Sequence, residues 1–288
     1  MNKKIKIFVF FIILTFIISC DSKEKQINLA VNEWIGYAPI FYANEKGWLK
    51  QDNIRLIRTV SLGESLNLYK SGLVNSLAAT QYEYKEIKKD VIPVILLDKS
   101  YGGDMLFSNK TIDELVHTKK KIDVYLEIDS VNYLLLKYFI KKHHISINRL
   151  NLINKDQQQL LLTTFDKSKP ILIITYAPYN IQYLKKGFHV IASTKTDKTL
   201  LVIDAIFTDK NNFSKNRFIL LKKYIDQAIN DIKNDPKKAY LVIQKYFPDY
   251  SYKDFKEGLK NIKWINNPNQ KLKQELIDID FYTKGLVK

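Results

Sequence analysis

Short apolar runs alternate with helical segments through the first third of the chain. The runs expected to form strands are residues 27–31, 54–60, 74–79 and 91–97. Two of these runs are followed by the Ser/Thr-x-x-Glu spacing of a helix capping box, in Ser61 with Glu64 and in Thr80 with Glu83. Strands that alternate with helices indicate βαβ units around a parallel sheet that is buried on both faces.

A second series of the same kind follows an interruption at residues 98–104. The paired Gly102 and Gly103 allow sharp changes of backbone direction there. Later strands are expected near residues 105–107, 122–126, 151–153, 171–175, 188–192 and 200–207. We therefore predict two lobes, residues 27–100 plus 200–288 and residues 101–199, with the return crossing near residues 194–200.

The rest of the chain has a helical period to its end. Phe218, Leu221, Ile225, Ala228 and Ile232 recur on one helical face. The Asp235-Pro236 pair is typical of the start of a further helix. A helical C-terminal region is therefore expected to pack against the first lobe.

The loop after the first strand has the composition of a binding loop. It contains Trp34, Gly36 and Tyr37, and Pro39 suits the first position of the helix that follows. Open α/β sheets bind ligands at the carboxyl ends of their strands, where aromatic faces and free helix N–H groups gather. The alternative is that Trp34 and Tyr37 only pack the strand against the helix.

The N-terminus is typical of an exported precursor. Lys3, Lys4 and Lys6 precede the apolar residues 7–18, a run too short for a membrane span, and Ser19-Cys20 follows. Cys20 is the only cysteine, so no disulfide can form within the chain. We predict a signal peptide over residues 1–19 and a short polar tether over residues 20–26.

The strongly positive net charge of the chain does not change the prediction of an exported protein. Residues 1–19 contain three lysines and no acid, so the net charge of +16 becomes +13 for the processed chain. The lysines are scattered rather than gathered in one run, which favours solvated faces over a nucleic-acid partner. Holding a basic protein close to anionic lipid is electrostatically favourable.

Five loops from both lobes are expected to meet in the cleft between them. Their side chains are aromatic, hydroxylic or acidic, and Lys99 is the only base among them. These side chains fit two classes of ligand. One is an oxyanion held by helix N–H groups and hydroxyls, and the other is a cation held by aromatic faces and a carboxylate. The candidate ligand-binding residues are Trp34, Gly36, Tyr37, Ser61, Thr80, Glu83, Ser100, Gly103, Asp104, Ser130 and Tyr176.

Several of these residues have a simpler structural interpretation. Ser61 and Thr80 can act only as helix caps, and Glu64 is interpreted as part of its capping box. For Glu83, capping and ligand binding are both open. Trp34 lies after the first strand of one lobe and Tyr176 ends a strand of the other, so we predict that they face each other across the cleft with the ligand between them.

Motifs for catalysis are scarce. The four histidines lack the spacing of a zinc site, and the sequence has no Gly-x-Ser-x-Gly elbow and no phosphate-binding Gly-Lys-Ser/Thr loop. A carboxylate pair could be drawn from Asp98 and Asp104, but no nucleophile or partner base accompanies it. We expect no catalysis, no cofactor and no metal.

Several motifs together resemble a known family, the solute-binding lipoproteins of bacterial nitrate, sulfonate and taurine ABC importers, which include binders of thiamine pyrimidine precursors. Residues 17–20 resemble the lipobox, in which the cysteine, here Cys20, carries the lipid. Eight further segments resemble the family's motifs for its strands, crossover, turn and closing helix. They are residues 34–39, 45–48, 80–83, 97–104, 125–130, 164–165, 173–179 and 281–286.

The resemblance implies a fold, a role and partners. The fold is the two-lobed type 2 periplasmic binding protein, α/β with parallel-rich sheets flanked by helices. The role is capture of a small solute for an ABC permease and ATPase, by a monomer exported and anchored to a bacterial membrane. The chain departs from the family at Ala177, where a Glu is usual, and at residues 166–169, which replace a Gly-x-x-Asp stretch.

Two other roles fit the same sequence. One is an exported enzyme related to the pyrimidine synthases that resemble these binders, which would need a catalytic His or a cofactor lysine in the cleft. The other is a surface lipoprotein that acts as a sensor or an adhesin. Neighbouring genes for a permease and an ATPase would separate transport from both.

Overall fold

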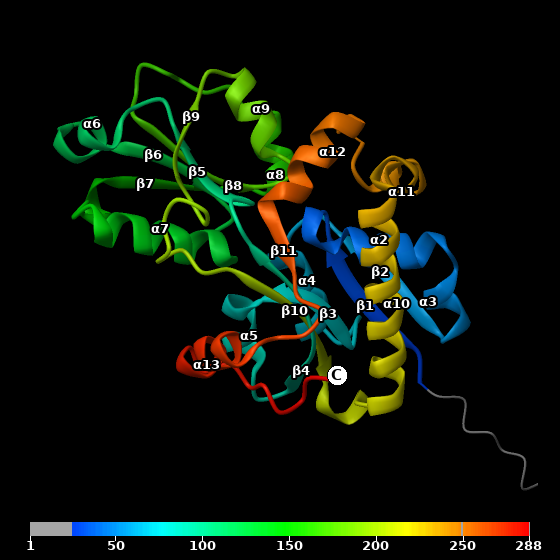
Figure 1. Cartoon of the computed structure of the whole chain (residues 1–288). Coiled ribbons are helices and arrows are strands. Elements are labelled where there is room, and N and C mark those ends of the chain that lie inside the picture. Colours follow the sequence, from blue (N-terminus) through cyan, green and yellow to red (C-terminus); the bar gives the residue numbers. More distant parts are fainter. Residues whose placement is uncertain (1–24, 249, 288) are drawn as a thin grey trace, which may run out of the picture.

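The computed structural model describes residues 25–248 and 250–287. The predicted signal peptide, Cys20 and most of the tether lie outside the described residues. The described chain forms two α/β lobes, each built around its own sheet (Figure 1). The α/β class and the two-lobed organisation are therefore confirmed.

The first lobe contains a six-stranded sheet in the order β11-β4-β10-β3-β1-β2. Its strands are β1 (Ile27–Asn32), β2 (Ile54–Thr59), β3 (Ser76–Thr80), β4 (Val91–Ser100), β10 (Ile203–Asp209) and β11 (Ile262–Trp264). β1 runs parallel to β2 and β3, as the βαβ pattern predicts. β10 is antiparallel to β3 and β4, between which it lies.

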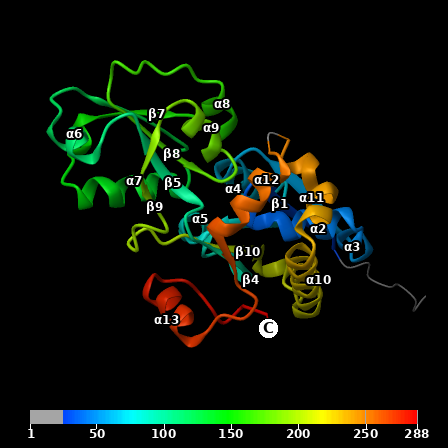
Figure 2. The same ribbon diagram turned by 45° about the horizontal axis from the view of Figure 1, so that its top comes forward.

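The second lobe contains a five-stranded sheet in the order β7-β6-β8-β5-β9. Its strands are β5 (Asp104–Ser108), β6 (Ile122–Leu126), β7 (Leu150–Asn154), β8 (Ile171–Tyr176) and β9 (His189–Ser193). β6 is parallel to β7 and β8, whereas β5 is antiparallel to β8 and β9. Figure 2 shows the two lobes side by side from a second direction.

Both sheets are mixed rather than mainly parallel. The antiparallel pairings involve the strands by which the chain crosses between lobes, β4, β5, β9 and β10, and the edge strand β11. A chain that enters a lobe along one strand and leaves it along a neighbouring strand must reverse its direction, which makes the two strands antiparallel. A buried strand has the same run of apolar residues whether it pairs parallel or antiparallel. The sequence pattern therefore could not distinguish them.

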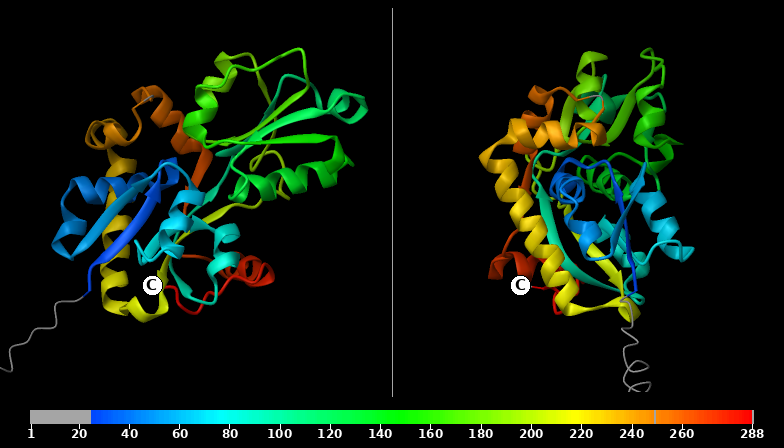
Figure 3. Two further views of the ribbon diagram at one scale, coloured as in Figure 1. Left: turned by 180° about the vertical axis from the view of Figure 1, so that it is seen from behind. Right: turned by 90° about the vertical axis from the view of Figure 1, so that its right-hand side faces the viewer.

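Helices cover the faces of both sheets. In the first lobe these are α2 (Ala38–Glu45), α3 (Trp48–Gln51), α4 (Leu62–Lys70), α5 (Gln81–Ile87), α10 (Lys215–Asn234), α11 (Pro236–Ile243), α12 (Tyr252–Gly258) and α13 (Gln270–Asp278). In the second lobe they are α6 (Ile112–His117), α7 (Val131–Lys142), α8 (Gln157–Leu161) and α9 (Asn180–Lys185). The long α10 buries Phe218, Leu221 and Ile225, members of the predicted apolar face, and runs the length of the first lobe (Figure 3).

The C-terminal region is not wholly helical, which corrects the sequence-based expectation. Residues 262–264 form the edge strand β11 on β4, and residues 281–286 form no helix. A three-residue strand is too short to leave an alternating pattern, and its backbone pairing to β4 is a long-range interaction. The α11–α12 segment reaches the second lobe, where the Tyr250 hydroxyl donates to Asn180 Oδ1 at 3.4 Å.

The two crossings between the lobes are fastened to each other. Ser100 Oγ and Thr194 Oγ1 are 2.7 Å apart, and Thr194 Oγ1 also accepts from the Gly102 N–H at 2.8 Å. Ser100 Oγ accepts from the Asp104 N–H at 3.1 Å. These bonds tie the start of β5 to the return segment after β9, so the two crossings form one hinge beside the cleft.

Candidate ligand-binding site

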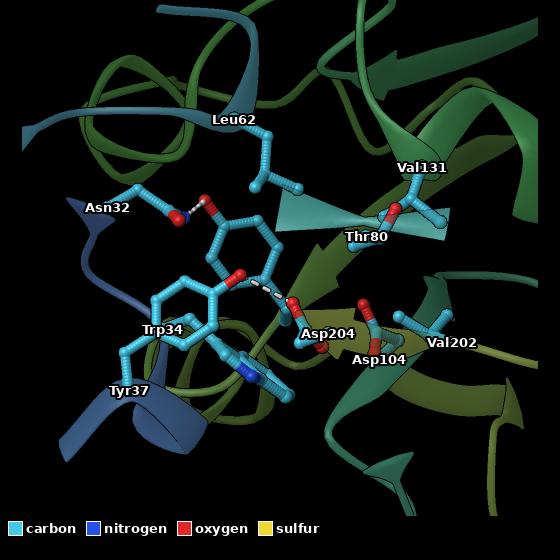
Figure 4. Close-up of a pocket in the computed structure, with 10 residues that line it drawn as sticks. Asn32, Trp34, Tyr37, Leu62, Thr80, Asp104, Val131, Val202 and Asp204 are labelled. Atoms are coloured by element: carbon cyan, nitrogen blue, oxygen red, sulfur yellow. Dashed lines mark hydrogen bonds between the residues drawn. The ribbon is translucent and has the colours of Figure 1, made fainter. Parts of the chain in front are cut away.

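A small buried pocket lies between the lobes, at the carboxyl ends of β1 and β3 (Figure 4). Its volume of about 10 Å³ leaves room for about one water molecule, so the cleft is closed. Both lobes contribute to the wall. The lining residues are Asn32, Trp34, Tyr37, Leu62, Thr80, Val202 and Asp204 from the first lobe and the return crossing, and Asp104, Val131 and Tyr176 from the second lobe.

Trp34 lies at the centre of this arrangement and is 4% exposed. Its Nε1 donates to Asp98 Oδ1 at 3.1 Å, with Oδ2 at 3.3 Å. Its ring fits a slot in which two glycines are required. A Cβ at Gly36 would lie 2.3 Å from Trp34 Nε1, and a Cβ at Gly103 would lie 2.3 Å from Trp34 Cη2.

The turn after β1 aims Tyr37 into the pocket. The Trp34 N–H donates to the Asn32 carbonyl and the Tyr37 N–H donates to the Trp34 carbonyl, which closes a 3₁₀ turn over Ile35–Tyr37 before α2. The Tyr37 hydroxyl donates to Asp204 Oδ1 at 2.5 Å, as Figure 4 shows. Burial, with the repulsion from Asp204, raises the pKa of Tyr37 well above its usual range, so this hydroxyl keeps its proton.

Tyr176 connects the lobes from the opposite wall. Its hydroxyl donates to Glu127 Oε1 at 3.1 Å and accepts from Asn32 Nδ2 at 3.3 Å. Its ring meets Trp34 edge to face, with centroids 6.0 Å apart. The two aromatics therefore face each other across the cleft, as the sequence predicts. They are in contact in this closed form, so a ligand could enter between them only after the lobes separate.

Glu83 caps one helix and contacts another. Its Oε2 accepts from the Thr80 N–H at 2.9 Å and from the Thr80 hydroxyl at 2.5 Å, which completes the predicted capping box of α5. Its Oε1 accepts from the Val131 N–H at 2.8 Å, at the start of α7 in the second lobe. This buried carboxyl is therefore both a cap and a bridge between lobes.

The cleft collects buried carboxyls whose pKa values are raised. Burial raises the pKa of Asp98 to about 8, against the opposing Trp34 hydrogen bond and with help from Asp104. Burial also raises the pKa of Asp104 to about 7 and that of Glu127 to about 8. The pKa of Asp204 is raised well above its usual range by burial and by repulsion from Asp98. Desolvation disfavours the ionised form of each group.

Five of the predicted residues line the pocket, and six do not: Gly36, Ser61, Glu83, Ser100, Gly103 and Ser130. Gly36 and Gly103 lie against the Trp34 ring, and Glu83 joins α5 to α7. Ser100 serves the hinge, and Ser130 is the N-cap of α7, where its hydroxyl accepts from the Asn132 N–H and donates to the Glu127 carbonyl. Ser61 caps α4 by accepting from the Glu64 N–H at 3.0 Å. Glu64 does not close a capping box, because its carboxylate accepts from the Val60 N–H instead.

The mouth of the cleft is a second, larger hollow of about 520 Å³. It lies between α4 of the first lobe and the loops after β6 and β7 of the second. Among its lining residues the acids are Glu64, Glu127, Asp129 and Asp156, and the only base is Lys155.

Sequence reasoning missed three polar residues of the site, Asn32, Glu127 and Asp204, and named Asp98 only as an acid of the cleft loops and part of a possible carboxylate pair. Asn32 and Asp204 line the pocket, while Asp98 and Glu127 hold Trp34 and Tyr176 by hydrogen bonds. One signal was available: Asp204 is the only charged residue in the apolar run 200–207. A charged residue inside a buried strand is rare unless it has a partner or a function.

No protein-family model matches this sequence, and no curated protein matches it. Solved structures do match. The alkanesulfonate-binding protein SsuA from Xanthomonas axonopodis pv. citri, bound to MOPS, aligns with a TM-score of 0.67 at 11% identity, over 91% of this chain and 96% of that one.

Two further solved structures give the same result. A ligand-binding component of an ABC-type import system from Staphylococcus aureus, with zinc bound, aligns at TM-score 0.67 and 12% identity, over 88% of this chain and 91% of that one. The nitrate-binding protein NrtA from Synechocystis PCC 6803 aligns at TM-score 0.63 and 11% identity, over 80% and 68% respectively. At these identities the likeness shows the fold, which is that of the periplasmic binding proteins.

Proposed function

We propose that this chain is the solute-binding component of an ABC importer and that it captures one small organic solute by closing its lobes around it. The observation that carries the proposal is the pocket lined from both lobes. Three buried atoms in its wall have no hydrogen-bond partner within the described protein: Asn32 Oδ1, Asp104 Oδ2 and Asp204 Oδ2. Buried polar atoms are normally paired, so unpaired ones around a cavity favour a ligand that pairs them.

Closure rests on direct bonds between the lobes beside the pocket. Glu83 meets the Val131 N–H, Asn32 meets Tyr176, and the Tyr179 hydroxyl donates to Glu33 Oε2 at 3.0 Å. A ligand that contacts both walls binds the closed form better than the open form and shifts the population toward it. The hinge at Ser100 and Thr194 would allow this motion.

The partners follow from this role. A membrane permease and its ATPase would receive the solute, and a lipid on Cys20 would hold the exported monomer at the membrane. No described helix has the length and apolarity needed to cross a bilayer. Labelling of the expressed protein with a radioactive fatty acid, and its loss in Cys20→Ser, tests the anchor.

A binding role rather than catalysis is supported by the composition of the pocket wall. A pyrimidine-synthase-like enzyme would need a His or a Lys there, and none of the described residues that line the pocket is basic. A permease gene and an ATPase gene beside this one would support transport against a sensor or an adhesin.

The role is tested by calorimetry with sulfonates, taurine, nitrate, thiamine pyrimidine precursors and amines. We expect one class to bind, and Trp34→Ala to abolish that binding. Because Trp34 is buried, the same variant should also lose about 3 kcal/mol of unfolding free energy. Failure of the folded wild-type protein to bind any of these classes would refute the proposal.

A further inference from the structure

The cleft concentrates buried carboxyl groups in a strongly basic protein. Glu83, Asp98, Asp104, Glu127 and Asp204 are each at least 95% buried around it, and repulsion between them contributes to several of their raised pKa values. In the described part of the chain none of the five has a Lys, Arg or His within ion-pair distance. A buried carboxylate without a cationic partner costs free energy, so these groups favour a ligand that supplies positive charge.

The hydrogen-bond donors of the site are already used inside the protein. Among the side chains, Trp34 donates to Asp98, Tyr37 to Asp204, and Tyr176 to Glu127. The Thr80 hydroxyl donates to Glu83.

Three helix N-termini at the cleft have side-chain caps as well. Ser61 caps α4, Thr80 and Glu83 cap α5, and Ser130 with Glu83 caps α7. An oxyanion needs free donors, and helix N-termini are the usual source when no basic side chain is present. Each of these three helices has at least one of its first N–H groups bonded to a side chain of the protein.

The unpaired atoms of the pocket wall are carboxyl and amide oxygens. Besides Asp104 Oδ2 and Asp204 Oδ2, the amide oxygen Asn32 Oδ1 is buried, unpartnered and on the pocket wall. Asn32 carries no charge, so it indicates independently of the carboxyls that the ligand brings N–H or O–H groups. Trp34, Tyr37 and Tyr176 add ring surfaces suited to an organic cation.

We propose that the solute is a small organic cation carrying N–H groups, bound between Asp104, Asp204 and Asn32, and that the site rejects sulfonate, nitrate and other oxyanions. This inference rests on the proposed solute-binding function and names the class of its ligand. The mouth, with the carboxylates Glu64, Asp129 and Asp156 against Lys155, would draw the same class inward.

Binding of a cation by these groups would release protons. Burial raises the pKa of Asp104 to about 7 and that of Asp204 well above its usual range, which favours their protonated forms when no cation is bound; a carboxyl that meets the cation gives its proton to the buffer and becomes a carboxylate. The titratable groups that face the two aspartates are Glu83 on α5, Asp98 on β4, Tyr37 after β1, and, across the cleft, Glu127 and Tyr176.

The test uses three probes that share a benzene ring and differ in charge: benzamidine as the cation, benzamide as the neutral analogue and benzenesulfonate as the anion. They are compared by calorimetry beside small primary amines, taurine and nitrate. We expect binding only by cations, with protons released in proportion to the heat difference between buffers of different ionisation enthalpy. Stronger binding by an anion, or equal binding by the neutral analogue, would overturn the inference and leave the binding function standing. No binding by any class would refute the binding function itself.

Two isosteric variants locate the effect. Asp104→Asn and Asp204→Asn should each weaken cation binding by roughly tenfold to a hundredfold, the range for a hydrogen bond to a charged group, and should reduce the protons released. Asp123→Asn removes a buried carboxyl of the second lobe that is outside the pocket and should leave both readouts unchanged. Unchanged cation binding in both pocket variants, with melting temperatures near that of the wild type, would overturn the assignment.

Discussion

Two hollows of this protein differ in almost every property. The interlobe pocket has a volume of about 10 Å³ and a wall of buried carboxyls and rings. A groove on the first lobe, beside α5, β4 and the C-terminal segment, has a volume of about 770 Å³ and contains four exposed lysines, Lys88, Lys89, Lys210 and Lys284. The groove is much the larger, yet the pocket has the features of a binding site.

The difference lies in what surrounds each charge. In the groove, Lys88 pairs with Asp280, Lys210 donates to the Lys89 carbonyl, and water reaches all four lysines. Such exposed pairs contribute little to stability or selectivity. In the pocket, polar atoms are cut off from water and unpaired, so a matching ligand gains the full strength of the interaction. Burial, rather than volume or the number of charges, favours the pocket as the candidate site.

We expect the largest effect on stability and binding from a substitution that adds a methyl group beside Trp34. A Cβ at Gly36 would lie 2.2 Å from Asp98 Oδ2, so Gly36→Ala must displace Asp98 or Trp34. We expect a loss of roughly 1–3 kcal/mol of unfolding free energy and no ligand binding. Denaturant titration and calorimetry measure these. Gly63→Ala is the control, because its Cβ would be 3.5 Å from the nearest atom and alanine favours a helix. Equal behaviour of the two variants would show that the slot around Trp34 is not tight.

The next largest effect is a pH dependence of stability that distinguishes buried carboxyls from exposed ones. Asp98, Asp104 and Glu127 have folded-state pKa values raised to about 8, 7 and 8, so the stability linked to their protonation is complete below their unfolded values and is lost as pH rises through 7 to 8. We expect the unfolding free energy of the ligand-free protein, and with it the melting temperature, to fall as the pH rises from about 6 to about 8, by on the order of 1 kcal/mol for each carboxyl.

Two variants assign this pH dependence. Asp98→Asn should make the fall shallower, because one of the buried acids is removed. Asp166→Asn should not, since Asp166 is exposed and its hydrogen bonds to Ser168 hold its pKa below the usual range. A melting temperature that stays flat from pH 6 to 9 in the wild type would contradict the burial of ionisable carboxyls in the cleft.

A smaller effect distinguishes a cap that joins the lobes from a cap that does not. Glu83 and Glu114 complete equivalent capping boxes with Thr80 and Thr111, but only Glu83 also accepts from Val131 across the cleft. Glu83→Gln should cost about 1 kcal/mol of ligand-binding free energy by weakening closure. Glu114→Gln should disturb only α6 and leave affinity unchanged. Parallel calorimetry on the two variants decides the point, and matched losses would remove Glu83 from the closing mechanism.

The smallest effect is expected in the groove. Lys210→Ala removes an exposed lysine and should change the unfolding free energy by less than about 0.5 kcal/mol. Ligand affinity should also stay the same. A clear drop in affinity would mean that the groove takes part in binding, and the contrast between the two hollows would fail.

Local features of the chain could be predicted from the sequence. The expected strand at residues 122–126 matches β6, Thr80 and Glu83 form the predicted capping box, and Gly102 and Gly103 lie at the predicted crossing. These features depend on residues within about one turn or one strand of each other, so their signal is contained in a short window. The aromatic partners Trp34 and Tyr176 were also found, because one follows the end of β1 and the other ends β8.

Tertiary structure decided the direction of the crossing strands, the existence of β11 and the chemistry of the pocket. Tyr37 and Asp204 are 167 residues apart, and Asn32 and Tyr176 are 144 apart. The sequence correctly listed hydroxyls, rings and acids but could not show which donors are consumed within the protein and which acceptors remain. A hydrogen bond forms between any groups that folding brings together, whatever their separation along the chain, so the charge that the cleft offers to a ligand exists only in the folded protein.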